Sequence, residues 1–89
     1  MLIVNGFMRY IEAYMLEPVQ VKMGRAALDW SAGKLGQKAG VGLATITRFE
    51  GGGGVTVKTL TKLETTLEKG GVIFIPRDAN GGPGVRLKR

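Results

Sequence analysis

Glycine sets the strongest limit on the fold, because its 15 occurrences among the 89 residues are concentrated where they interrupt regular structure. Residues 51–54 are four consecutive glycines, and glycine-rich segments at 70–71 and 81–84 bracket an apolar stretch. Each glycine in a helix interior costs about 1 kcal/mol relative to alanine, so no helix continues cheaply through the run of four. The chain is therefore predicted to fold as several short elements within one domain.

The N-terminal elements are predicted from the proline at position 18. Segment 8–16 is short, mostly apolar and compatible with a helix, and Glu17 ends it because a residue before proline avoids helical dihedral angles. Pro18 can then open a second helix at its first position. Within 19–30 the apolar residues recur at helical spacing and predict one buried stripe: Val19, Met23, Ala26, Ala27 and Trp30.

Three further helices are predicted between polar caps and glycines. Ser31 is a good N-cap for a helix over 32–39, and Gly40 fits the left-handed position after its end. A short helix follows over 42–50, and Thr56 caps a longer one over 56–69. The predicted buried positions of these helices are Ala32, Leu35, Ala39, Leu43, Ile46, Phe49, Val57, Leu60, Leu63 and Leu67.

The C-terminal segment, 71–89, predicts β-structure. Residues 72–75 form an apolar strand stopped by Pro76, residues 78–84 have turn composition, and 85–88 alternate apolar and basic side chains. A single hairpin is marginal in water, so we expect it to dock on the helices or to add to a partner's sheet. The predicted fold class is mainly α with a short C-terminal β-strand or hairpin, preceded by an N-terminal helical extension at 1–17.

The residue types that are missing exclude much chemistry. The chain has no cysteine, which excludes disulfides, thiolate metal sites and a cysteine nucleophile. It has no histidine, the commonest general base and transition-metal ligand. We therefore expect no catalytic residues, no metal and no cofactor, and a protein that is not an enzyme.

Charge points to a polyanionic partner. The formal charge of +6 is concentrated in residues 20–50, with five basic and two acidic residues, and in 71–89, with four basic and one acidic. Such a balance suits nucleic acid or an anionic surface, or serves solubility alone. Arg9 and Glu12 interrupt the apolar opening well short of a membrane span, so we expect a cytoplasmic protein that does not associate with membranes.

The stretch 28–51 has the composition of two short helices joined by a tight turn. Small residues at 36 and 39 stand where the helices approach, and a glycine stands at the turn, at position 40. The apolar residues that pin the second helix to the first are Leu35, Val41, Ile46 and Phe49. The residues left outward on the second helix are slim enough to enter a major groove: Gly42, Ala44, Thr45, Thr47 and Arg48.

These residues resemble the helix-turn-helix of lambda-repressor-like domains, the Cro/repressor type or XRE family. The resemblance rests on Trp30-Ser31-Ala32, Leu35, Ala39-Gly40-Val41, Thr45-Ile46 and Arg48-Phe49-Glu50-Gly51, and covers about residues 19–69. It implies a compact four- to five-helix bundle, with a DNA-binding domain over 18–70. It also implies a regulator that usually binds palindromic operators as a homodimer. The sequence itself offers three candidate dimer surfaces, the helix at 8–16, the strand at 72–75 and the tail at 85–88. The C-terminal segment 71–89 is favoured, because an exposed apolar strand edge would otherwise invite aggregation.

The resemblance also implies which residues contact double-stranded DNA. Leu43 and Ala44 would touch thymine methyls, Thr47 would hydrogen-bond a base edge, and Arg48 would donate to guanine or phosphate. The base-reading set in the major groove is Leu43, Ala44, Thr45, Thr47 and Arg48. The phosphate set is Ser31, Lys34, Gln37, Lys38, Gly52, Gly53, Thr56 and Lys58.

The sequence departs from the family's pattern at three places. The polar residue that commonly begins the first motif helix is Ala32, and the usual alanine facing the turn is Gly36, which fits sterically but loosens the helix. The run 51–54 replaces an ordinary loop, and its amides either approach a phosphate or belong to a floppy segment. Alternative roles are packing for Trp30, and solvation or pairing within the helix for Arg48 and Glu50.

Two functions from different classes follow. The first is a transcriptional regulator that binds an inverted-repeat operator as a homodimer, an autoregulating protein of the kind found on mobile elements or as a controller. The alternative is an antitoxin-like module that binds DNA through its helices and a small protein partner through its C-terminal segment by strand addition.

Overall fold

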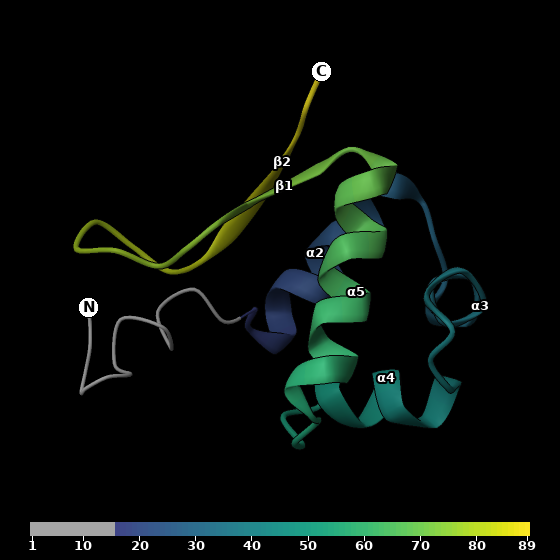
Figure 1. Cartoon of the computed structure of the whole chain (residues 1–89). Helices are drawn as coiled ribbons and strands as arrows, with labels where there is room; N and C mark the ends of the chain where they lie inside the picture. The colour runs from purple at the N-terminus through teal and green to yellow at the C-terminus, as the bar shows by residue number, and fades with distance from the viewer. Residues whose placement is uncertain (1–15) are drawn as a thin grey trace.

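Four helices and one β-hairpin make up the part of the chain that the computed structural model describes, residues 16–89 (Figure 1). The helices are α2 (Pro18–Leu28), α3 (Ala32–Ala39), α4 (Leu43–Glu50) and α5 (Val57–Gly70), and the strands are β1 (Val72–Ile75) and β2 (Gly84–Leu87). This confirms the mainly α class with a C-terminal hairpin. The predicted extension at 1–17, with its helix at 8–16, lies outside the described residues except for Leu16 and Glu17.

The predicted helix boundaries are confirmed by their caps. The Ser31 hydroxyl accepts a hydrogen bond from the Lys34 N–H at 3.0 Å, and the Thr56 hydroxyl accepts one from the Thr59 N–H at 3.1 Å. Gly40 follows α3 with φ 71°, in the left-handed region that glycine adopts without steric cost. Local capping chemistry is therefore sufficient to begin and end these short helices.

The buried face of α2 differs from the predicted stripe. Val19, Ala26 and Ala27 are exposed, and Met23 and Trp30 are only half-buried; the buried residues of α2 are Gln20, Val21 and Gly24. The helix also ends at Leu28, because Asp29 adopts a left-handed conformation with φ 59°. The stripe prediction was wrong because a count of apolar residues gives no weight to a glutamine or a glycine on the core side.

Helix α5 lies at the centre of the core. Its Leu63 and Leu67 are fully buried, as are Leu35 of α3 and Ile46 of α4, as predicted. Val57, predicted as buried, is 65% exposed because it begins the helix outside the core. Each buried leucine contributes about 1.5–3 kcal/mol of transfer free energy, so a few such residues hold this small core together.

The hairpin packs against α2 and α5 and is antiparallel, with Val72 opposite Leu87 and Phe74 opposite Val85. Its second strand begins at Gly84, one residue before the predicted start. The buried Gln20 side chain donates hydrogen bonds to the carbonyls of Ile75 at 3.0 Å and Gly84 at 3.1 Å, one on each strand. Of the two expectations for the hairpin, docking on the helices is the one observed within this chain.

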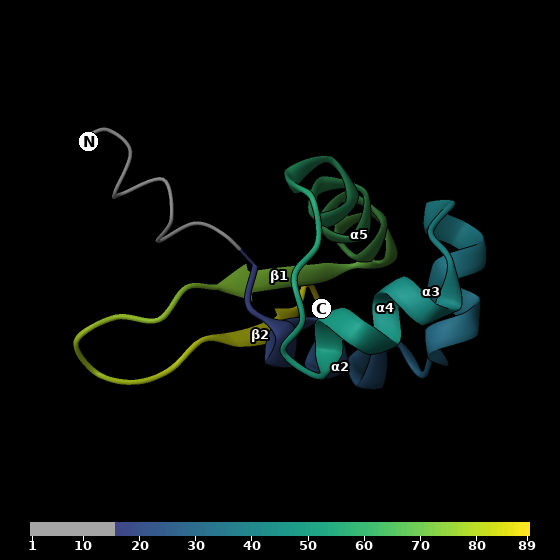
Figure 2. The same ribbon diagram turned by 90° about the horizontal axis from the view of Figure 1, so that it is seen from below.

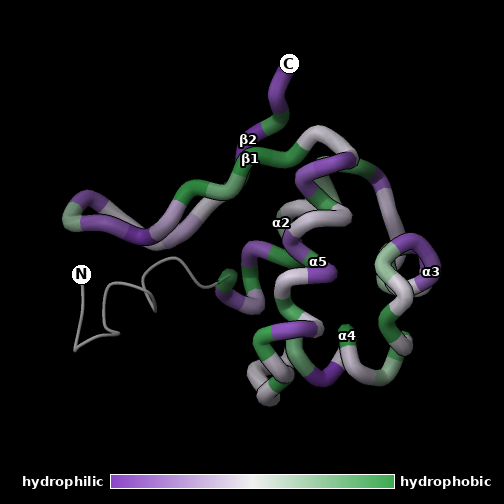
Figure 3. The backbone as a smooth tube through the Cα atoms, viewed as in Figure 1, coloured by the Kyte–Doolittle hydropathy of each residue, from purple (hydrophilic) through white to green (hydrophobic). Residues whose placement is uncertain are grey.

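The loop that joins the strands is hydrophilic on either side of its tip, in contrast to the apolar strand β1 (Figure 3). Arg77 in this loop donates to both carboxylate oxygens of Glu17, at 2.8 and 2.9 Å. This pair lowers the pKa of Glu17 and raises that of Arg77, in both cases mainly through the hydrogen bonds. Within residues 16–89, no helix has the length and apolar character needed to cross a membrane.

Candidate nucleic-acid interface

The turn between α3 and α4 lies directly on α3. The Val41 N–H donates to the Gly36 carbonyl at 3.0 Å, and a Cβ atom added to Gly36 would lie 2.5 Å from the Val41 oxygen. No real Cβ tolerates such a separation from a backbone atom. Gly36 is therefore required by the turn, whereas the sequence had indicated that an alanine and a glycine would both fit there.

The inner face of α4 is fixed by packing and by one ion pair. Ile46 and Phe49 are buried in the core. Glu50 accepts two hydrogen bonds from Arg25 of α2, at 2.7 and 2.8 Å, and Arg25 also donates to the Trp30 carbonyl at 3.1 Å. The Glu50 hydrogen bond raises the pKa of Arg25. Glu50 was expected to be solvated or paired within its own helix; it instead ties α4 to α2.

The outer face of α4 is open to solvent. The exposed residues are Leu43, at 55% exposure, and Ala44, Thr47 and Arg48, while Thr45 is half-buried. The outward orientation predicted for Ala44, Thr47 and Arg48 is confirmed, and that of Thr45 only in part. The prediction that Leu43 is buried was wrong, because Leu43 begins the helix outside the core. Helix α4 runs along the end of the bundle remote from the hairpin, and the view from below shows it in front of α2 (Figures 1 and 2).

A shallow hollow of about 460 Å³ joins α4 to the first turn of α5. It is lined by Thr45 and Arg48 of α4 and by Gly54, Val55, Thr56 and Thr59. The first turn of a helix presents unpaired amides and a partial positive charge. The hollow therefore brings the basic residue Arg48 together with a helix N-terminus, two features that both favour a negatively charged group.

The glycine run ends α4 in an ordered way. The N–H groups of Gly52 and Gly53 donate to the carbonyls of Phe49 at 2.9 Å and Arg48 at 2.8 Å. A Cβ added to Gly53 would lie 2.5 Å from Cγ of Arg48, so the absence of a side chain makes room for the arginine stem. These two amides are engaged inside the chain, which removes the reason for placing a phosphate on them.

The remaining phosphate candidates are divided between two places. All four on α3 and its cap are exposed: Ser31, Lys34, Gln37 and Lys38. Lys38 lies over Trp30, with Nζ 5.0 Å from the ring centroid, which places its charge toward the C-terminal end of α5. Lys58 is exposed in the first turn of α5, next to Thr56.

Arg25 positions α4 and Gln20 positions the hairpin, and sequence reasoning found neither residue. Arg25 is 25 residues from Glu50, and Gln20 is 55 residues from Ile75. No local spacing rule joins residues so far apart, so nothing in the pattern identified them. Within the described residues, no three acidic side chains come close enough together to hold a metal ion.

No family model matches the chain, and no match is found among curated proteins.

Proposed function

We propose that this chain is a sequence-specific DNA-binding regulator of the lambda-repressor-like type, with α4 as the helix that enters the major groove. One observation carries the proposal. The inner face of α4 is held against the core by Ile46, Phe49 and the Arg25–Glu50 ion pair, while its outer face is exposed to solvent. A helix that reads bases needs both properties, because the base contacts are only as well defined as the position of the helix.

Each outward side chain of α4 suits a role in base recognition. Leu43 and Ala44 are apolar and stand in the first turn, where they can contact thymine methyl groups. Thr47 offers a hydroxyl that both donates and accepts, and Arg48 offers the donors that guanine or phosphate accepts. Thr45 is half-buried and lines the hollow beside α5, so in this proposal it contacts the DNA at the edge of the major groove.

The phosphate contacts in this proposal come from α3 with its cap and from the start of α5. On α3 they are Ser31, Lys34 and Gln37, because Lys38 lies over Trp30 toward the other end of α5. At the start of α5 the contact is the hollow between Arg48 and Thr56. Contacts to the phosphate backbone release counterions, so the affinity is expected to fall steeply as salt concentration rises. The engaged amides of Gly52 and Gly53 are not included.

The proposed active form is a homodimer on an inverted repeat. Two half-sites about 34 Å apart roughly double the contact free energy of one small domain. The outward face of β1 supports this form, because Ile73 and Ile75 are 40% and 39% exposed side by side on one strand face. An apolar strand face of this kind is usually covered by a partner.

Selection of binding sequences from random duplex DNA tests the proposal. We expect an inverted repeat to be enriched and the purified chain to shift it. The combined Thr47→Ala and Arg48→Ala variant should lose about 10- to 100-fold or more of its discrimination between that site and random DNA, because each base contact contributes about 1–3 kcal/mol.

The matched control replaces a threonine and a basic residue on an exposed part of α5, Thr61→Ala with Lys62→Ala, and should retain discrimination. Circular dichroism checks that both variants stay folded. If the α4 variant kept full discrimination, or if selection enriched no sequence, the proposed reading helix would be wrong.

A further inference from the structure

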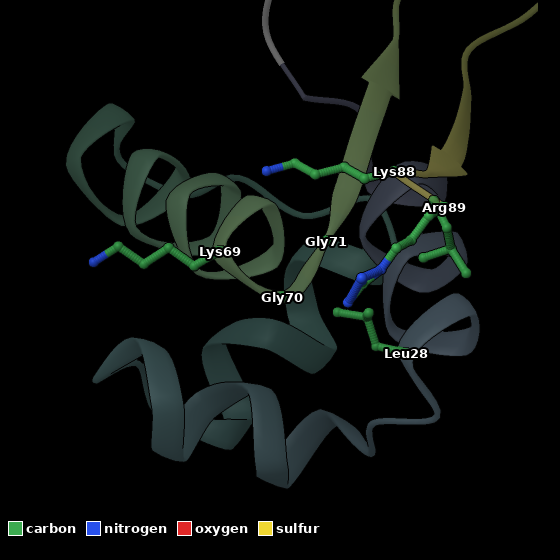
Figure 4. Close-up of a pocket in the computed structure, with 7 residues that line it drawn as sticks. Leu28, Lys69, Gly70, Gly71, Lys88 and Arg89 are labelled. Atoms are coloured by element: carbon green, nitrogen blue, oxygen red, sulfur yellow. The ribbon is translucent and has the colours of Figure 1, made fainter.

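A second basic surface lies at the other end of α5, where the hairpin and α2 meet the last turn of this helix (Figure 4). A hollow of about 480 Å³ there has an apolar floor, Leu28 and Leu87, with Gly70 and Gly71 between them. Its basic side chains are Lys69, Lys88 and Arg89. Arg89 reaches toward Leu28, while the ammonium ends of Lys69 and Lys88 point out to the same side (Figure 4).

A second hollow of about 370 Å³ adjoins the first and shares Lys69 and Gly70 with it. It adds Trp30, Lys38 and Thr66. We call the two hollows together the α5 C-terminal groove. Its apolar part is Leu28, Trp30 and Leu87, and its basic part is Lys38, Lys69, Lys88 and Arg89.

Gly70 packs closely against the floor of this groove. A Cβ added there would lie 2.6 Å from Cδ1 of Leu28 and 2.9 Å from Cη2 of Trp30. The last turn of α5 therefore lies directly against the apolar floor, and a side chain at position 70 would displace it.

Within the part of the chain that the structure describes, no acidic side chain pairs with the cations of the groove. Both hollows lack acidic lining residues, and within residues 16–89 the ion pairs formed are Arg25–Glu50 and Arg77–Glu17, which leave these four cations aside. A ligand that complements four cations around an apolar floor must itself carry both negative charge and apolar surface.

We propose that the α5 C-terminal groove binds an acidic, amphipathic peptide segment of another protein. The apolar side chains of the peptide would cover Leu28, Trp30 and Leu87, and its carboxylates would meet the surrounding lysines and Arg89. The contact leaves the outer face of α4 free, because the two surfaces lie at opposite ends of α5 (Figure 1). A chain that holds DNA at one end can therefore hold a partner protein at the other.

Two other occupants fit this groove less well. A nucleic-acid phosphate is a purely polar group and would leave the apolar floor of Leu28, Trp30 and Leu87 uncovered. A second copy of the chain in a symmetric dimer would place the same patch of cations against itself. Both are distinguished by the test.

The test begins with selection of random peptides displayed on phage against the full chain. We expect enriched peptides to contain acidic residues interspersed with apolar ones. Trp30 is the one tryptophan of the sequence and lies in the groove, so binding of a synthetic copy of an enriched peptide should change its fluorescence. This readout reports on the groove itself and requires no DNA, so it succeeds or fails independently of the proposed regulator function.

The combined Lys69→Glu and Lys88→Glu variant should bind the selected peptide roughly tenfold or more weakly, because two attractive charge contacts become repulsive. The matched control reverses two exposed lysines outside the groove, Lys22→Glu with Lys62→Glu, and should bind as the parent does. The neutral Lys69→Gln and Lys88→Gln variant should fall between them, and circular dichroism checks that each variant is folded.

Three kinds of result would overturn the proposal. The first is a negative peptide experiment, either selection without enrichment of acidic and apolar residues or equal binding of the peptide by groove and control variants. The second is displacement of the peptide by random duplex DNA that itself requires Lys69 and Lys88, which would make the groove a nucleic-acid surface. The third is a changed oligomeric state of the groove variant in sedimentation, which would make the groove an interface between copies.

Discussion

The end of the molecule that carries α4 and the end that carries the hairpin each contain an arginine that donates two hydrogen bonds to a glutamate. The two ion pairs differ in how exposed their side chains are to solvent. Arg25 and Glu50 hold α4 at 2.7 and 2.8 Å, and Arg77 and Glu17 hold the hairpin loop at 2.8 and 2.9 Å. The side chains of the first pair are 21% and 8% exposed, and those of the second are 63% and 33% exposed.

The hydrogen-bond lengths of the two ion pairs are nearly the same, so the difference in burial decides how much each pair contributes to stability. Removing one member of a buried pair leaves the other charge without water or partner, which is strongly destabilising. Removing one member of an exposed pair returns the other to solvent at little cost. The end of the molecule that carries the proposed DNA-reading helix is thus rigidly positioned, and the hairpin end depends more on Gln20 than on its ion pair.

The largest effect is expected for Arg25→Met. The variant leaves Glu50 buried without its partner, and because Arg25 keeps some contact with water we expect a loss of about 2–3 kcal/mol in the free energy of unfolding. Urea denaturation followed by circular dichroism measures it. The combined variant Arg25→Met with Glu50→Leu should recover much of the loss; if it does not, the cost lies in packing and not in the orphaned charge.

Gly36→Ala is expected to cost about 2 kcal/mol, because the added methyl group collides with the Val41 carbonyl and forces the turn away from α3. Gly33 in the same helix is the matched control, since its added Cβ would meet nothing closer than 3.8 Å. Gly33→Ala should stabilise the protein by about 0.5–1 kcal/mol through helix propensity. Thermal unfolding of both variants measures the contrast, and equal effects would show that the turn is not tight.

Gln20→Ala should cost about 1–2 kcal/mol at the hairpin end, because the carbonyls of Ile75 and Gly84 lose their side-chain donor. Amide hydrogen exchange should show faster exchange in β1 and β2 than in α4. If amide exchange became equally faster in α4 and in the hairpin, the two ends would unfold together and Gln20 would not stabilise the hairpin end alone.

The smallest effect is expected for Arg77→Ala, with a change in unfolding free energy near the error of measurement and further reduced by salt. Because Arg77 lowers the pKa of Glu17, any contribution of the pair is present above the ordinary carboxylate pKa. This stabilisation is lost as the pH falls through the lowered pKa of Glu17, where the carboxylate becomes protonated. The stability curves of the parent and the variant should therefore converge in acid, and divergence there would contradict the assignment.

The sequence by itself determined the features that depend on interactions between residues close together in the chain. Ser31, Thr56 and Gly40 mark helix ends through hydrogen bonds and dihedral preferences that span only a few residues, and the structure confirms all three. The apolar spacing of α5 and the outward face of α4 were predicted for the same reason. Periodicity within one helix is visible without knowledge of its neighbours.

Only the tertiary structure decided which distant groups meet. The core side of α2 carries Gln20 and Gly24, the first because its amide meets both hairpin strands and the second because Leu67 packs against it. The partner of Glu50 and the cations gathered around the end of α5 are likewise contributed by separate segments. Burial and charge pairing between segments depend on how the helices pack, and that packing minimises exposed apolar area and unpaired polar groups over the whole chain at once.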